Sequence, residues 1–256
     1  MMESKAPVDC YAEKPLIVVR SVKKNYQLGE VKIRAVNGID LVINQGEFVT
    51  ILGRSGSGKS TLLYLLAGLE GVDAGEIIID GKHIEKMTEA DLIMFRQRNI
   101  GFVFQSFHLL PYYTAAENVA LPLIFSGMNA KFRREKALAM LELVGLQSHA
   151  AHMPRQLSGG QQQRIGIARA LVSDPKIVFA DEPTGNLDSK TSVEIMGLLA
   201  DVFHRLRTTF VMVTHDAAWA DYGDQTITIS DGKVIMHSGS GMEKYNSSNK
   251  MIKIDI

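Results

Sequence analysis

Gly53-Arg54-Ser55-Gly56-Ser57-Gly58-Lys59-Ser60 is the stretch that decides the fold of this chain. It matches the phosphate-binding loop pattern G-x-x-x-x-G-K-[ST] at every fixed position. Residues 47–52, just before it, are apolar and favour a strand, and residues 61–67 favour a helix that stops at Gly68. Because this loop needs a strand before it and a helix after it, the motif stands in the right context. The stretch predicts a binding site for a nucleoside triphosphate.

The chemistry of the loop follows from its residue types. Glycines let the backbone curl so that its N–H groups point inward, and the next helix directs its positive end to the same point. Lys59 is then placed to reach the outer phosphates as a point charge, and the Ser60 hydroxyl to ligate Mg²⁺. We expect the whole loop, together with Thr61, to bind the nucleotide and its metal ion.

The composition limits the class of protein. The 256 residues are 46% hydrophobic, enough for one domain or one domain with a subdomain. Lys and Arg together number 28, as do Asp and Glu, so no broad nucleic-acid-binding surface is expected. Cys10 is the only cysteine, which excludes an intrachain disulfide. No apolar stretch reaches the roughly 18 residues of a membrane span, and no secretory signal is visible, so any contact with a membrane is expected to be peripheral.

The N-terminal part of the chain predicts a small antiparallel sheet. Short β-rich runs at residues 16–19, 33–36 and 39–43 are separated by turn residues. Residues 75–81 add a hairpin with its turn at Asp80-Gly81.

The rest of the chain predicts a parallel sheet with helices packed on it. Residues 177–180 and 210–213 are fully apolar, as expected for central strands of such a sheet. Further strands are expected at 100–104 and 226–229, and a helix-rich segment at 114–155 lies between them. Strands that alternate with helices indicate an α/β fold.

Asp181-Glu182 follows the apolar strand at residues 177–180. An Asp at the carboxyl end of such a strand, near the phosphate loop, is suited to hold Mg²⁺ directly or through water. The adjacent Glu182 would point at the terminal phosphate, where a carboxylate polarises the attacking water. The long interval between Lys59 and Asp181 predicts that the helix-rich segment forms a subdomain.

Leu157-Ser158-Gly159-Gly160-Gln161 is a second anion-binding motif. The Ser158 hydroxyl and the Gly159 and Gly160 amides are expected at a helix N-terminus, with no side chains in the way. Two phosphate-binding motifs in one chain suggest either two ligands or one ligand gripped by two chains.

With these motifs the sequence resembles the ATP-binding subunits of ABC transporters over nearly its whole length. It matches the phosphate loop, the signature motif at residues 157–161 and Asp181-Glu182, and residues 186–188 resemble the D-loop of that family. Residues 101–111, 117–119 and 181–188 are similar to the branch that serves lipoprotein release, macrolide or peptide efflux and glycolipid export.

The resemblance implies further site residues. Tyr26 matches the aromatic A-loop and would stack on adenine, and Gln105 matches the Q-loop and would touch Mg²⁺ or the water. His215 matches the switch histidine, which would hydrogen-bond the γ-phosphate, and Asp188 would meet the opposing phosphate loop in a dimer. Gln161 belongs to the signature motif.

The resemblance also implies a groove for a helix of a membrane partner. Five apolar and aromatic residues are candidates to line it, the alternative being that they form the core of the subdomain: Phe107, Leu109, Leu110, Tyr112 and Tyr113.

The sequence and the resemblance together predict an ATPase with a P-loop NTPase fold of the RecA-like kind. An antiparallel β subdomain and a helical subdomain, at about 106–160, would complete a cassette at 16–238, between a flexible arm (1–15) and a flexible tail (239–256). Two copies would close head-to-tail on ATP and Mg²⁺ and drive separate permease subunits at the cytoplasmic face of the inner membrane, with a periplasmic adaptor as a further partner through the permease.

Two alternatives remain at this point. A soluble ABC ATPase of DNA repair, translation or cluster assembly would carry long inserts, a fused second cassette or a basic face, and the sequence shows none of them. A nucleotide-binding regulator without turnover would lack Glu182 or His215, and both are present. The transported substrate cannot be inferred from this chain.

Overall fold

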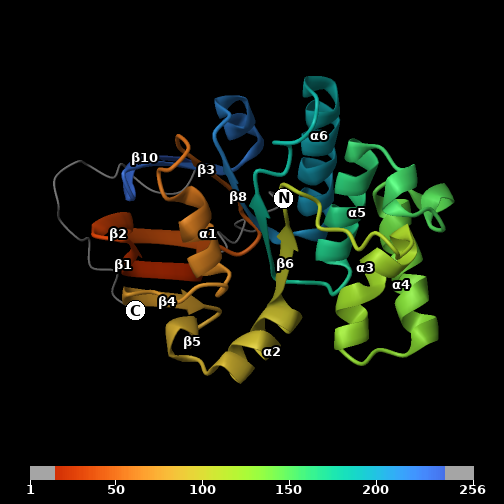
Figure 1. Ribbon diagram of the computed structural model, residues 1–256, viewed down its shortest axis with the longest axis horizontal. Helices are drawn as coiled ribbons and strands as arrows, with labels where there is room; N and C mark the ends of the chain where they lie inside the picture. Colours follow the sequence, from red (N-terminus) through yellow and green to blue (C-terminus); the bar gives the residue numbers. More distant parts are fainter. Residues whose placement is uncertain (1–14, 240–256) are drawn as a thin grey trace, which may run out of the picture.

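The computed structural model describes residues 15–239. The predicted arm and tail fall almost wholly on residues 1–14 and 240–256, outside the described range, and the subdomain limits stay a prediction. Figure 1 shows a central sheet, with an antiparallel sheet and helix α1 on one side and a group of helices on the other.

The central sheet has six strands. In spatial order they are β10 (Lys233–Gly239), β9 (Gln225–Ser230), β3 (Phe48–Leu52), β8 (Thr209–Thr214), β7 (Ile177–Asp181) and β6 (Ile100–Val103). The five strands from β9 to β6 run parallel, and β10 is antiparallel to β9. Every residue of β7 and β8 is buried, as their apolar sequences predict. The expected parallel sheet is confirmed.

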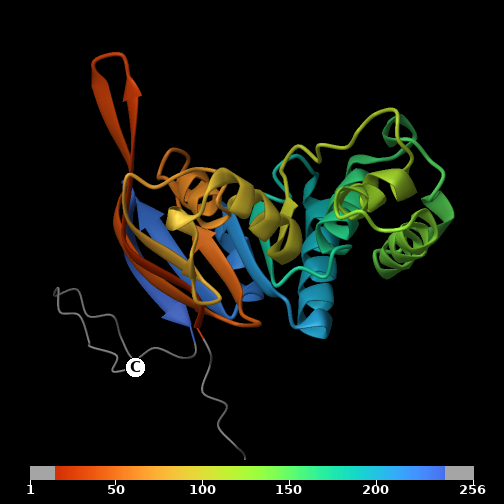
Figure 2. The ribbon, with the colours of Figure 1, turned by 90° about the horizontal axis from the view of Figure 1, so that it is seen from below.

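The second sheet is antiparallel and has four strands. In spatial order they are β2 (Val31–Asn44), β1 (Pro15–Leu28), β4 (Ala74–Ile79) and β5 (Lys82–His83). The antiparallel sheet and the hairpin turn at Asp80-Gly81 are confirmed, but the prediction of three short runs was wrong. β1 and β2 are two strands of 14 residues whose hairpin projects from the body of the molecule (Figure 2). Asn37-Gly38 resembles a turn, yet the pairing of β1 and β2 runs through it with Gly38 at φ 76°.

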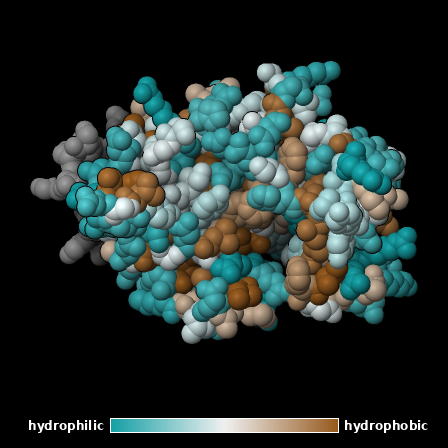
Figure 3. Space-filling model, in the orientation of Figure 1, coloured by the Kyte–Doolittle hydropathy of each residue, from teal (hydrophilic) through white to brown (hydrophobic). Residues whose placement is uncertain are grey.

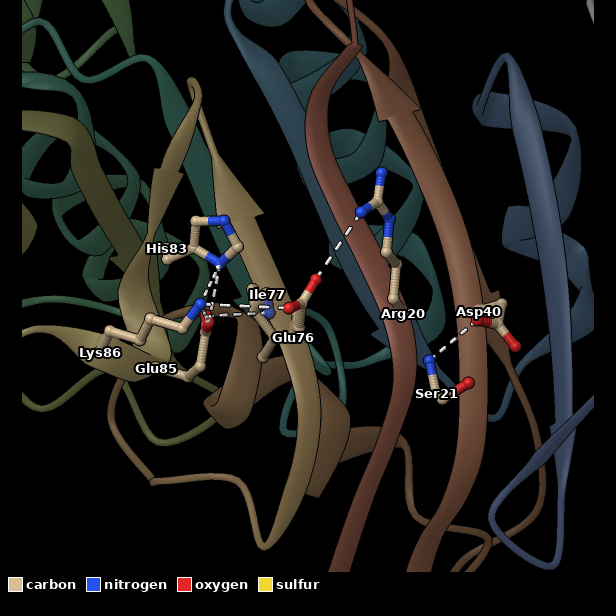
Figure 4. Close-up of polar contacts among 8 residues, drawn as sticks. All are labelled: Arg20, Ser21, Asp40, Glu76, Ile77, His83, Glu85 and Lys86. Carbon is tan, nitrogen blue, oxygen red and sulfur yellow. Dashed lines mark hydrogen bonds and ion pairs between the residues drawn. The ribbon is translucent and has the colours of Figure 1, made fainter. Parts of the chain in front are cut away.

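Polar contacts hold the outer face of this sheet in register (Figure 4). Ser21, a bulge residue at φ 47°, donates its backbone N–H to Asp40 Oδ1 at 2.8 Å. Beyond β4, the carboxylate of Glu85 accepts from the backbone N–H of Ile77 at 3.1 Å and lies 2.8 Å from His83 Nδ1. Burial acts to raise the pKa of Glu85, but hydrogen bonds from its own backbone, His83 and Ile77 outweigh it and hold the pKa below its usual value.

Side-chain caps begin most of the helices. The helices are α1 (Lys59–Leu66), α2 (Glu89–Asn99), α3 (Ala115–Phe125), α4 (Ala130–Leu143), α5 (Gly159–Leu171) and α6 (Ser189–Leu206), with short 3₁₀ turns at Ile84–Lys86, Gln147–His149, Pro154–Gln156 and Ala217–Tyr222. Thr114 and Glu117 form a capping box at α3, and Asn129 caps α4. These caps position the helix-rich segment that the sequence predicted.

The hydrophobic core lies in two parts. One part fills the space between the two sheets and α1, with Ile17, Ile51 and Leu62 fully buried. The other packs the opposite face of the central sheet against α5 and α6 and continues into α3 and α4. Within residues 15–239, no helix is long and apolar enough to cross a membrane.

Candidate nucleotide-binding site

The phosphate loop joins β3 to α1 and is held in one conformation by its own backbone. Gly56 and Gly58 lie at φ 79° and 99°, where side chains are rarely tolerated. A Cβ on Gly58 would lie 2.0 Å from the carbonyl oxygen of Ala35, so only glycine fits there. Lys59 is 4% exposed, and its ammonium donates to the Arg54 carbonyl at 2.9 Å. The loop thus has the shape and charge that a phosphate requires.

Burial and charge act in opposite directions on Lys59. Desolvation lowers its pKa, while the nearby carboxylates of Glu182 and Asp181 act to raise it. The lysine therefore lies close enough to both acidic residues for their charges to affect its pKa.

Asp181 ends β7 and meets α1. The Ser60 hydroxyl donates to Asp181 Oδ1 at 2.9 Å, and Asp181 is 9% exposed. A hydroxyl and a carboxylate are the hard oxygen ligands that Mg²⁺ prefers, so this pair fits the predicted metal ion. The described residues contain no cluster of three or more His, Cys, Asp and Glu side chains that would hold another kind of metal.

Glu182 follows Asp181 and is paired with His215. Its backbone lies at φ 42°, in the left-handed region, and its N–H donates to the Val213 carbonyl at 3.0 Å. The Glu182 carboxylate is 3.1 Å from His215 Nδ1, and the His215 side chain is 59% exposed. The carboxylate predicted to act on water therefore has a histidine beside it.

A cleft of about 580 Å³ contains the phosphate loop. Among the described residues, the following line it: Tyr26, Ile33, Arg34, Ala35, Asn37, Ser55, Gly56, Gly58, Lys59, Ser60, Thr61, Glu182, Asp231 and Gly232. Three residues of the phosphate loop do not line the cleft: Gly53, Arg54 and Ser57. Gly53 lies against β9, since a Cβ on it would be 2.4 Å from the Ile229 carbonyl oxygen. Of these three residues, Ser57 is buried and Arg54 is exposed.

Tyr26 lies in β1, at one end of this cleft. Its hydroxyl donates to the carboxylate of Glu70, in the segment after α1. Burial is the main cause that raises the pKa of Tyr26, and the bond to Glu70 adds to it. The ring is therefore anchored where it lines the cleft, and its stacking on the base of the nucleotide stays a prediction.

The sequence did not indicate that the β9–β10 turn belongs to the site. Gly232 donates its N–H to the carbonyl of Ser57 at 3.0 Å, and its own carbonyl accepts from Asn37 at 2.8 Å. Asp231-Gly232 is a typical hairpin turn, but no local signal could place it against the phosphate loop.

Gln105 does not line the cleft. It follows β6 and lies beside the segment after Glu182: its carbonyl accepts from the Asn186 side-chain amide at 3.0 Å. A Cβ on Gly185 would come within 2.8 Å of the Gln105 amide nitrogen. Buried Gln163, which the sequence did not single out, donates to the Pro183 carbonyl at 2.6 Å and ties α5 to the same segment.

The signature residues form a separate group outside the cleft. Ser158 caps α5: its hydroxyl accepts from the Gln161 N–H at 3.3 Å, and the Gln161 carboxamide oxygen accepts from the Ser158 N–H at 2.9 Å. Gly159 and Gly160 begin the helix, and a Cβ on Gly160 would lie 2.5 Å from the methyl carbon of Thr191.

Asp188 lies beside the signature group. It caps α6 by accepting from the Thr191 N–H at 3.0 Å and from the Thr191 hydroxyl at 2.6 Å. These hydrogen bonds lower the pKa of Asp188. The structure therefore divides the predicted site residues into a cleft group around Lys59 and a group around Ser158.

The fold and the cleft together define a P-loop NTPase cassette. The sequence pattern of the family described as "ABC transporter" matches residues 36–185, and the chain belongs to this family. It therefore carries the ATPase domain of ABC transporters, as the sequence predicted.

Three relatives show how this cassette is arranged in longer and shorter proteins. The macrolide export ATP-binding/permease protein MacB of Chlorobaculum tepidum is 48% identical over 220 residues, which cover 86% of this chain but only 34% of that protein. An uncharacterized ABC transporter ATP-binding protein of Thermotoga maritima is 48% identical over 86% of this chain and 94% of its own length. The lipoprotein-releasing system ATP-binding protein LolD of Pseudoalteromonas translucida is 43% identical over 86% of this chain and 94% of its own length.

Two solved structures of one similar cassette, MJ0796, have the same fold. Both are dimeric, and one is a post-hydrolysis state bound to ADP and Pi. They are 43% and 44% identical to this chain, with a TM-score of 0.82, and each covers 89% of this chain and 100% of its own.

Proposed function

We propose that this chain is the ATP-hydrolysing motor subunit of a transporter, in which two copies close head-to-tail on ATP and drive separate membrane permease subunits. The observation that carries the proposal is the division of the site. The cleft is lined by Lys59, Glu182 and Ser60, whose hydroxyl donates to Asp181, whereas Ser158 and the α5 N-terminus lie outside it. An isologous dimer brings each group of one chain to the other group of its partner.

The residues that line the cleft and those beside it have distinct proposed roles. Lys59 and the loop amides bind the phosphates, and Ser60 with Asp181 holds Mg²⁺, which supplies positive charge against the developing negative charge. Glu182 orients and deprotonates the attacking water. His215, beside Glu182, and Gln105, beside Gly185, contact the γ-phosphate and the water side of the site. Tyr26 stacks on the base.

A second cleft, of about 560 Å³, is the proposed docking site of the permease. It lies between α2 and α3 and is lined by Ile93, Gln97, Ile100, Gly101, Phe102, Leu121, Pro122, Phe125, Arg169, Ala170 and Ser173. Apolar side chains gather on this face of the molecule (Figure 3), and Phe125 is 76% exposed. An apolar helix end of a permease fits such a surface.

The five residues predicted to line a groove for a membrane partner lie outside this second cleft. Phe107, Leu109, Leu110, Tyr112 and Tyr113 lie in the segment between β6 and α3, beside the cleft. Arg169, which lines the second cleft, donates to the Phe107 carbonyl at 2.7 Å and so connects this segment to the cleft. The role of these five residues in contacting a membrane partner stays a prediction.

Export or membrane extraction of a lipoprotein, lipid, peptide or drug is the proposed transport task. The similarity to MacB and LolD supports it and favours a transporter over the soluble ABC ATPases of repair or translation. We place the chain at the cytoplasmic face of the inner membrane, held there by its permease, with contact to a periplasmic adaptor only through that permease.

Mixed dimers test the head-to-tail arrangement. Lys59→Ala chains and Ser158→Arg chains are each expected to be nearly inactive as ATPases. In a mixed dimer one interface carries both lesions and the other carries none, so activity should return to roughly half per mixed dimer by site counting. No recovery in verified heterodimers would contradict the proposal that each interface works independently with Ser158 acting across chains.

A further inference from the structure

Both carboxylate oxygens of Asp181 are occupied by hydroxyl groups from one helix. The Ser60 hydroxyl donates to Oδ1 at 2.9 Å, and the Tyr64 hydroxyl donates to Oδ2 at 2.6 Å. Ser60 and Tyr64 are four residues apart in α1, so they lie one above the other on the same helix face. The phosphate-loop pattern ends at Ser60 and assigns nothing to Tyr64.

The bond from Tyr64 fixes the orientation of the carboxylate. A carboxylate held by one oxygen can turn about its Cβ–Cγ bond, whereas two donors on opposite oxygens prevent that rotation. Hydrogen bonds to an ionised acceptor are short and about twice as strong as neutral ones. With Tyr64 on Oδ2, Oδ1 is kept toward the hydroxyl of Ser60, the other residue that would hold the metal ion.

Tyr64 is itself positioned by rigid neighbours. Its ring lies 6.0 Å from the ring of Phe102 in β6, and Phe102 stacks on Phe104 at 4.4 Å. Its carbonyl accepts from the Leu69 N–H at 2.9 Å, which closes the end of α1. The hydroxyl is thus directed at Asp181 by the sheet and the helix together.

We propose that Tyr64 is a positioning residue for the metal site: its phenol holds the Asp181 carboxylate in the orientation that binds the divalent cation of the nucleotide complex. The inference rests on the proposed function, because it requires Ser60 and Asp181 to bind that cation. Groups that orient a metal ligand in this way typically change metal affinity 10–100-fold when removed.

Binding of Mn²⁺, a probe for Mg²⁺, tests the proposal without turnover. The parent is the full chain with Glu182→Gln, to which Tyr64→Phe is added; phenylalanine keeps the ring contact with Phe102 and removes only the hydroxyl. Titration of Mn²⁺ in the presence of ATP, followed by electron paramagnetic resonance, should show about tenfold weaker Mn²⁺ binding. ATP binding in EDTA and the unfolding temperature should change little. Tyr222→Phe is the matched control and should match the parent, because it removes a phenol hydroxyl from the turn at Ala217–Tyr222, which does not line the cleft.

A double-mutant cycle with Asp181→Asn shows whether Tyr64 acts through Asp181. If it does, Tyr64→Phe should add less than a twofold effect once the carboxylate is gone. Unchanged Mn²⁺ binding in the first variant, an effect of full size in the Asp181→Asn background, or an equal loss of ATP binding in EDTA would each overturn the inference. A parent chain that binds ATP in EDTA but shows no saturable Mn²⁺ site would instead refute the metal site of the proposed function.

Discussion

Glu182, the candidate base, has its backbone in the left-handed region, which non-glycine residues rarely adopt. A non-glycine residue at φ 42° costs about 1 kcal/mol, and here a hydrogen bond to Val213 holds it there. The strained backbone turns the carboxylate into the cleft and to within 3.1 Å of His215. Strain that persists beside a phosphate loop and a metal-binding pair fits a residue that acts in the reaction.

Glu182→Gln is expected to separate binding from hydrolysis. Glutamine keeps the size and the contact with His215 but removes the proton acceptor, so phosphate release should fall on the order of 10²–10⁴-fold. ATP affinity should stay within a few-fold of the wild-type value. Parallel measurement of nucleotide affinity and phosphate release gives the answer; near-normal release would remove Glu182 from the role of base.

Gly58→Ala is expected to distort the phosphate loop. A methyl group there would lie 2.0 Å from the Ala35 carbonyl oxygen, so backbone must move, and nucleotide binding should be lost with a fall in the unfolding temperature. Gly127→Ala is the matched control: Gly127 has a positive φ of 75° but no atom within 4 Å of its Cβ position, so only the cost of about 1 kcal/mol for the left-handed backbone remains. Equal effects of the two variants on ATP binding would contradict the close approach to Ala35.

At the scale of elements, the second sheet depends on a half-buried carboxylate. Glu85 bridges the backbone of β4 at Ile77 and the side chain of His83 in β5 (Figure 4). Because its pKa is lowered in the folded chain, its contribution to stability is fully present above the unfolded value of 4.5. It is lost as the pH falls through the lower folded pKa.

Glu85→Gln should therefore destabilise the chain in a pH-dependent way. At pH 7 we expect a loss of about 1.5 kcal/mol in the free energy of unfolding, since hydrogen bonds to a charged acceptor are replaced by weaker ones. The difference from wild type should shrink below pH 4.5, where the wild-type carboxylate takes up its proton. Urea unfolding at a series of pH values measures this difference in the free energy of unfolding. Glu142→Gln, on the exposed face of α4, is the control. A difference that grows on acidification would show that the carboxylate is not the stabilising form.

The elements that the sequence revealed are those with a local signal. Strands β7 and β8 were predicted because buried parallel strands are apolar throughout, and α4 falls in the segment predicted to be rich in helix. α2 was missed since only Phe95 on it is buried, so it has almost no apolar periodicity. Asn37-Gly38 was misread as a turn because a bulge inside a long strand uses the same residue types.

The candidate site could be predicted only as far as its motifs extend. Lys59, Ser60 and Asp181 belong to local patterns, and the structure brings them together because β3, β8 and β7 are neighbours in the sheet. Gly232 carries no pattern of its own, and its contact with Ser57 is created by the pairing of β9 with β3. Such contacts depend on topology, which local sequence does not state.

At the scale of the whole molecule, the two anion-binding motifs face outward. Ser55 in the phosphate loop and Ser158 at the start of α5 are both exposed. Groups that meet across an interface between two chains must be exposed in the single chain. The first lies on the core sheet and the second on the helical side of the molecule (Figure 1). Two chains related by a two-fold axis can bring these groups together twice, with ATP between them.

Engineered cysteines test that arrangement directly. In a Cys10→Ser background, Ser55→Cys with Ser158→Cys should give a covalent dimer under mild oxidation, and the yield should rise several-fold with ATP when Glu182→Gln prevents hydrolysis. Two cysteines form a disulfide only when their Cα atoms approach within about 7 Å, so the bond requires the head-to-tail contact. Ser55→Cys with Ser126→Cys is the matched control, because Ser126 is equally exposed but follows α3 and should not face the phosphate loop of a partner. Denaturing electrophoresis without reductant separates the covalent dimer from the single chain. If the dimer yield does not depend on ATP, or if the two cysteine pairs give equal yields, ATP does not join Ser158 of one chain to the phosphate loop of the other.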